Sequence, residues 1–152
     1  MMSTDLKTQT ELHATLNRQT ANWTLLGIKL HHYHWFVTGT DFFTLHSQFE
    51  EYYDEAAEYV DTVAERLLAI GGKPASTMKE YLALSSLQEA TGGESAKEMV
   101  ATLVKDYTIL AQELSAGITL AEESGDQPTG DLFIGIRTSV EKHIWMLNAY
   151  LA

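Results

Sequence analysis

The sequence predicts an all-α protein, a bundle of four long helices with a long connection between the second and the third. Apolar residues recur at three- and four-residue spacing through most of the 152 residues, which is the period of an α-helix. Only Pro74 and Pro128 interrupt the chain, and both lie near glycines between the periodic segments. No repeat, low-complexity tract or linker is present. We therefore expect one domain over residues 1–152, with 1–7 as a short flexible tail.

The first predicted helix covers residues 8–37. Its opening sequence, Thr8-Gln-Thr-Glu11, fits a capping box, in which the two end residues satisfy each other's backbone N–H groups. Gly39 follows the last periodic residue, as glycine commonly does at helix ends. The alternative of two shorter helices leaves the long periodic run unexplained.

The second predicted helix begins near Thr40 or Asp41 and ends at Ile70, where two glycines and then Pro74 give a stop signal. The connection that follows, residues 72–94, is too long for a simple antiparallel turn. Within it, the sequence ASTMKEYLAL predicts a short helix.

The third predicted helix opens at a second capping-box pattern, Ser95-Ala-Lys-Glu98, and runs to Ser124 before a glycine. The fourth covers about residues 129–150. Its apolar residues recur at helical intervals and predict a single core-facing side: Leu132, Ile136, Val140, Ile144, Leu147 and Leu151. Two short links on either side of one long crossover are the connectivity of ferritin-like four-helix bundles. A fold of this kind does not by itself supply a function.

Composition limits the partners and the chemistry. The formal net charge of -11 disfavours nucleic acid phosphates and anionic membranes and favours cations. No cysteine is present, which removes disulfides, thiolate zinc sites and cysteine nucleophiles. No run of 18 apolar residues and no signal-like N-terminus is found, so we expect a soluble, cytoplasmic protein.

One stripe of the second predicted helix carries four residues of types that can bind metals. At 100° per residue, His46, Glu50, Asp61 and Glu65 lie at about 0°, 40°, 60° and 100° around the helix axis. His46 and Asp61 are nevertheless separated by about 22 Å along that axis. The two ends of the stripe therefore cannot bind one ion within a single chain.

A second copy of the chain resolves this separation. If two copies of the helix pack antiparallel about a two-fold axis between Glu55 and Ala56, His46 faces the partner's Glu65 and Glu50 faces the partner's Asp61. Such an isologous contact creates two equivalent sites. His34, at the end of the first helix, could supply a second imidazole to each.

Imidazole with carboxylate oxygens suits Fe(II), and also Zn or Mn, while carboxylates stabilise the higher charge of Fe(III). Other ferritin-like bundles bind two irons inside one subunit through Glu-x-x-His motifs. No histidine of this chain has a glutamate three residues before it. The site between subunits is therefore preferred.

The segment from His34 to Gly72 resembles the Dps family, the starvation-associated mini-ferritins. The residues that carry the resemblance are HW…G…FF.LH…FE…YDEAAE.VDT.AERLLAIGG. The resemblance covers nearly all of the chain. It implies a dodecameric cage that oxidises Fe(II) with hydrogen peroxide or dioxygen at two-fold interfaces, stores ferric mineral and relieves oxidative stress. The ligands that it implies come from two subunits: His34, His46 and Glu50 from one, and Asp61 and Glu65 from its mate. The family often has aspartate at the position of Glu50, and the glutamate side chain is longer than aspartate by one methylene.

Four residues outside this set have expected roles, and the resemblance implies three of these roles. Trp35 would lie near the iron and absorb stray oxidising equivalents, although packing is its simpler role. By its spacing, one helical turn before His34, His31 could contact the ligands rather than the metal, although a contact at the helix surface or at an interface is its simpler role. Asp126 and Asp131 would line a three-fold pore through which iron enters, and both also suit capping of the fourth helix.

Two other classes of function remain open. Some Dps proteins bind and compact DNA through a lysine-rich tail, but the first eleven residues here contain only Lys7, beside Asp5 and Glu11, so DNA binding is expected to be weak or absent. The other is a purely structural bundle whose acids only confer solubility.

Overall fold

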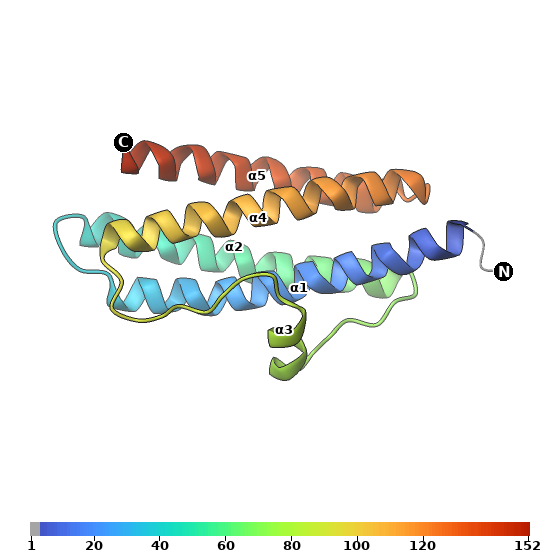
Figure 1. Cartoon of the computed structure of the whole chain (residues 1–152), viewed down its shortest axis with the longest axis horizontal. Coiled ribbons are helices and arrows are strands. Elements are labelled where there is room, and N and C mark those ends of the chain that lie inside the picture. The colour runs from blue at the N-terminus through green and yellow to red at the C-terminus, as the bar shows by residue number, and fades with distance from the viewer. Residues whose placement is uncertain (1–3) are drawn as a thin grey trace.

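Helices account for most of the chain, as the sequence predicts (Figure 1). The computed structural model describes residues 4–152. The elements in this range are α1 (Thr4–Phe36), α2 (Phe42–Ala69), α3 (Met78–Leu84), α4 (Ala96–Glu123) and α5 (Gln127–Leu151). The all-α prediction of four long helices and one short helix is confirmed.

The long helices pack as two antiparallel pairs, α1 with α2 and α4 with α5. After α2 the chain forms α3, which lies against α1, and then returns along the bundle to the start of α4 (Figure 1). This is the predicted crossover. A short loop joins α1 to α2. His34, in the last turn of α1, and His46, near the start of α2, lie on either side of this loop.

Most helix boundaries agree with the sequence signals. Ser95 and Glu98 form the predicted capping box at the start of α4. Gly39, after α1, and Gly71, after α2, have φ values of 105° and 91°, in the left-handed region that glycine adopts without a Cβ clash.

The start of α1 differs from the prediction. The helix already includes residues 4–7, so Thr8 lies inside it, and the predicted capping box at Thr8 is wrong. The segment before Thr8 contains no glycine or proline, so nothing stops the helix from extending toward the N-terminus. Of the expected tail over 1–7, residues 4–7 are helical, and residues 1–3 lie outside the described part of the chain.

One hydrophobic core joins the two helix pairs. Its largest fully buried side chains include Trp23, Tyr33, Tyr107, Phe49 and Phe133. The predicted core face of α5 is confirmed, since each of its six residues is buried or packs against the core. Within residues 4–152, no helix is long and apolar enough to cross a bilayer.

Candidate metal centre

His34 and His46 form a stacked pair at the junction of α1 and α2. Their ring centroids are 3.6 Å apart and their planes differ by 14°. His34 Nδ1 lies 2.6 Å from the backbone oxygen of His46, and His46 Nδ1 lies 2.7 Å from the backbone oxygen of His34. The short loop between the helices makes this reciprocal arrangement possible.

These bonds determine where the ring protons lie. A carbonyl oxygen can only accept a hydrogen bond, so each Nδ1 must carry the hydrogen and donate it. In the neutral imidazole the other nitrogen, Nε2, then has a free lone pair. A histidine whose Nδ1–H is held by a carbonyl is the usual form of a metal ligand, and both rings are prepared in this way.

Glu50 lies one helical turn after His46 on α2, on the same face of the helix. The hydroxyl of Tyr53 donates a hydrogen bond to Glu50 Oε1 at 3.2 Å. Burial and this contact with Glu50 raise the pKa of Tyr53, which keeps the hydroxyl protonated. Tyr53 was not among the residues chosen from the sequence, although its position three residues after Glu50 is a signal that it shares the face.

Two α1 residues, His31 and Trp35, lie next to Tyr53 and to each other. His31 stacks on Tyr53, with centroids 3.7 Å apart and planes 17° apart, and its Nδ1 donates to the backbone oxygen of Gly27 at 2.9 Å. The Trp35 ring centroid is 5.4 Å from that of His31, and the Trp35 side chain is exposed. An exposed indole contributes little to the core of this chain, so core packing does not account for Trp35.

Asp61 and Glu65 lie near the other end of α2, and both are exposed. Among residues 4–152, no three histidine and acidic side chains come together closely enough to hold a metal ion. The single chain thus brings together His34 and His46. Glu50 follows one turn after His46 on the same face of α2, and Asp61 and Glu65 lie near the other end of that helix. This is the separation that the helix geometry predicts.

Two residues without an assigned role form a separate pair inside the bundle. His143 Nε2 on α5 lies 2.9 Å from Glu55 Oε1 on α2, and the Ser139 hydroxyl donates to Glu55 Oε2 at 2.8 Å. Glu55 is therefore not simply a solvated acid, and His143 has an acidic partner. Sequence spacing could not show a contact between residues 88 positions apart.

Asp126 caps α5, as one of its two expected roles requires. It accepts hydrogen bonds from the backbone N–H and the hydroxyl of Thr129, and from the Arg66 guanidinium at 3.0 Å. Burial alone raises the pKa of Asp126, but these donors outweigh it and hold the pKa below its usual value. Asp131 is exposed, beside Glu122 in a shallow hollow.

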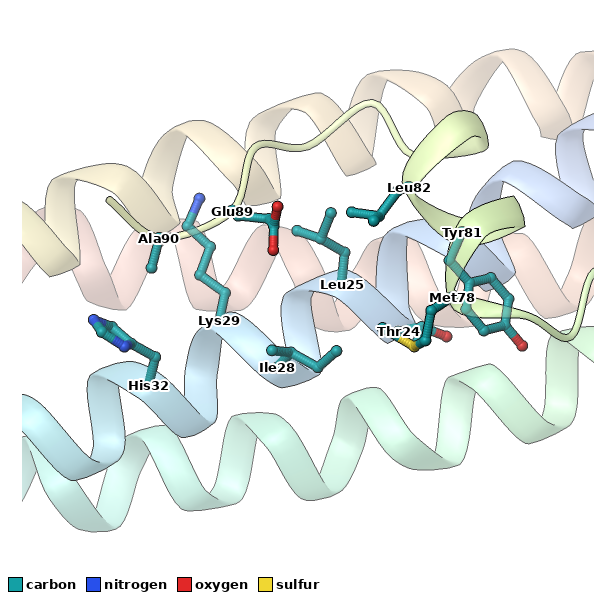
Figure 2. Close-up of a pocket in the computed structure, with 10 residues that line it drawn as sticks. All are labelled: Thr24, Leu25, Ile28, Lys29, His32, Met78, Tyr81, Leu82, Glu89 and Ala90. Carbon is teal, nitrogen blue, oxygen red and sulfur yellow. The ribbon is translucent and has the colours of Figure 1, made fainter. Parts of the chain in front are cut away.

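A pocket of about 190 Å³ lies between α1, α3 and the crossover. Figure 2 shows Lys29, His32 and Glu89 toward one end and Met78, Tyr81 and Leu82 toward the other. None of the candidate site residues lines this pocket. It is therefore separate from the histidine pair.

Comparison with known proteins identifies the family. Residues 13–152 match the ferritin-like domain. The chain is 53% identical to general stress protein 20U of Bacillus subtilis over 141 residues, which cover 93% of this chain and 97% of that protein. It is 54% identical to DNA protection during starvation protein 2 of Bacillus anthracis over 136 residues, or 90% and 93% of the two chains.

The fold comparison agrees. A crystal structure of a Dps protein from Bacillus brevis superposes with a TM-score of 0.95 at 48% identity, covering 99% of this chain and 100% of that one. The long crossover with its short helix is therefore part of a ferritin-like bundle, and the resemblance noted in the sequence is confirmed. The chain belongs to the Dps family of ferritin-like proteins.

Proposed function

We propose that the protein is a ferroxidase and iron store, which oxidises Fe(II) at sites shared by two subunits. The observation that carries this proposal is the stacked pair of His34 and His46, whose Nδ1–H groups are both held by carbonyls. Two free Nε2 atoms and the Glu50 carboxylate form half of a metal site. Family membership supports a role in iron storage and in DNA protection in general.

Asp61 and Glu65 of a second subunit complete the site in this proposal. The exposed apolar residues of α2 support the antiparallel contact independently. Phe43 is 85% exposed and Leu68 is 58% exposed, which is unfavourable for large apolar side chains in water. Both lie on the stripe of the metal ligands, and the two-fold axis that pairs the ligands also places Phe43 opposite the partner's Leu68.

The chemistry follows from the ligands. Imidazole nitrogens bind Fe(II), and carboxylates stabilise the Fe(III) that oxidation produces. When hydrogen peroxide is the oxidant, it takes one electron from each of two Fe(II) ions and, with two protons, leaves as two waters. Dioxygen is the alternative oxidant. Paired transfer avoids release of hydroxyl radical.

The rest of the proposal concerns assembly and transport. A dodecameric cytoplasmic cage, implied by the resemblance, would hold ferric mineral inside. Asp131, which is exposed, is available to line an entry pore. Asp126 is less available, because its charge is paired with Arg66. Rings of acids attract cations to such openings.

Anaerobic soaking of crystals with Fe(II) tests the proposal directly. We expect metal density bound by His34, His46 and Glu50 on one side and by the partner's Asp61 and Glu65 on the other. Density elsewhere in the assembly, with none between the two α2 helices, would contradict a shared site.

The apolar ends of the stripe give a test of the two-fold contact. Phe43→Lys and Leu68→Glu should each weaken assembly, because each places a charge against an apolar partner. The double variant should recover assembly, since the lysine then faces the partner's glutamate. Light scattering measures the particle mass. Assembled single variants, or a double variant no better than the singles, would rule out this register.

DNA binding is not favoured as a second function. Several relatives are named for DNA protection, but protection can result from removing iron and peroxide. The net charge of -11 and the single lysine among the first eleven residues oppose contact with phosphates.

A further inference from the structure

Tyr53 touches three residues of the candidate centre. Its hydroxyl donates to Glu50 Oε1 at 3.2 Å. Its ring stands edge-on to His34, with centroids 5.3 Å apart and an interplanar angle of 89°. The same ring also stacks on His31, with centroids 3.7 Å apart. Within residues 4–152, no other side chain donates a hydrogen bond to Glu50.

The side chain of Glu50 needs such a restraint more than an aspartate would. Glutamate has one more rotatable bond, and fixing a side chain costs conformational entropy that grows with the number of such bonds. Glu50 is also exposed, so packing does not fix its rotamer. A donor that holds one carboxylate oxygen in place removes part of this cost before any metal binds.

Tyr53 is itself held in place. The stacked His31 ring covers one side of it, and His31 is anchored by its bond from Nδ1 to the backbone oxygen of Gly27, 2.9 Å away. Three α1 residues, Gly27, His31 and His34, therefore help to determine the position of a hydroxyl on α2. Because these contacts already hold the Tyr53 ring in place, its hydroxyl can bind the flexible Glu50 carboxylate with little further loss of conformational entropy by the tyrosine.

We propose that Tyr53 is a positioning residue for the iron site, which holds the Glu50 carboxylate in its metal-binding rotamer and so compensates for the extra methylene of glutamate. The inference rests on the proposed function, because it takes Glu50 to be a ligand. Tyr53 does not bind the metal. It acts through Glu50 alone, while His31 supports its ring.

The test is Tyr53→Phe, which keeps the ring and its stacking and removes only the hydroxyl. We expect the Fe(II) concentration that gives the half-maximal initial oxidation rate to rise about 3- to 10-fold, the effect of losing one hydrogen bond. The rate at saturating Fe(II) should change less. Anaerobic Fe(II) titration should show the same loss of affinity.

A double-mutant cycle separates positioning from packing. In a Glu50→Asp background the carboxylate is shorter by one methylene and no longer reaches the hydroxyl, so adding Tyr53→Phe should have no further effect. Tyr150→Phe is the matched control, because Tyr150 donates a similar bond to Asp41 Oδ2 at 3.0 Å, and Asp41 is not one of the proposed ligands. It should leave Fe(II) affinity unchanged.

Two results would overturn the inference. An unchanged affinity in Tyr53→Phe means that the hydroxyl positions nothing. An equal loss on adding Tyr53→Phe to the wild-type chain and to the Glu50→Asp variant means that Tyr53 acts through packing. If wild-type protein instead shows no saturable Fe(II) oxidation, the proposed function itself is wrong, which distinguishes the two failures.

Discussion

Replacing His34 and His46 together with alanine is expected to abolish rapid Fe(II) oxidation while the cage still assembles. The change removes both imidazole ligands and leaves each half-site with Glu50 alone. Loss of groups that only support metal ligands already costs about 10- to 100-fold, so we expect a larger loss here. The measurement is the initial rate of Fe(III) formation after peroxide is added to anaerobic Fe(II)-loaded protein.

The control must separate lost ligands from a damaged fold. The two rings donate hydrogen bonds to backbone oxygens at the α1–α2 junction, so their loss also destabilises that junction somewhat. Light scattering and thermal unfolding report assembly and folding of the same samples. His13→Ala, which removes an imidazole outside the centre, should oxidise iron at the normal rate. Unchanged peroxide-driven kinetics in the double variant would exclude these histidines from the mechanism.

The fold was predictable because its signals are local. Helical periodicity, glycines at helix ends and the Ser95 capping box each depend on residues close together in the sequence. The error at Thr8 has the same origin. A Thr-x-x-Glu pattern looks identical at a helix start and inside a helix, and only a preceding glycine or proline would have distinguished them.

The candidate centre was predictable only where it lies on one helix. His46 and Glu50 share a face of α2 by spacing, and the distance to Asp61 predicts that one chain cannot complete the site. The contact of Tyr53 with His31 depends on how α1 packs against α2. A second contact, between Glu55 and His143, forms only after the two helix pairs come together. Neither contact leaves a pattern in a single sequence.

One buried ion pair gives the largest expected effect on stability. Lys29 Nζ lies 2.8 Å from Asp106 Oδ2, with the two side chains only 3% and 7% exposed. Lys29 also donates to the backbone oxygen of Gln88 at 2.7 Å, which ties the crossover to α1. Burial raises the pKa of Asp106 even though Lys29 lowers it. The desolvation cost of the carboxylate therefore exceeds the gain from its partner.

Asp106→Leu is expected to lower the free energy of unfolding by about 3–5 kcal/mol, because it leaves the Lys29 ammonium buried without a counter-charge. Lys29→Met should cause a smaller loss of stability than Asp106→Leu at acidic pH, since the unpaired Asp106 can take up a proton there. The stability of the Lys29→Met variant should fall as pH rises, because a group whose pKa is raised by folding binds more protons in the folded state than in the unfolded state. The double variant, which removes both charges, should lose much less than Asp106→Leu alone.

Urea unfolding followed by circular dichroism measures these differences, at one fixed protein concentration because self-association adds to apparent stability. Glu141→Ala is the matched control. It breaks the Arg137–Glu141 pair, whose side chains are 42% and 54% exposed, and exposed pairs of this spacing contribute only about 0.5 kcal/mol or less. A loss as small in Asp106→Leu as in Glu141→Ala would show that water reaches Lys29 and that the pair is not buried in solution. If Asp106→Leu loses much stability and the double variant regains it, the loss comes from the unpaired Lys29 charge, since the same crossover and helices surround the site in both variants.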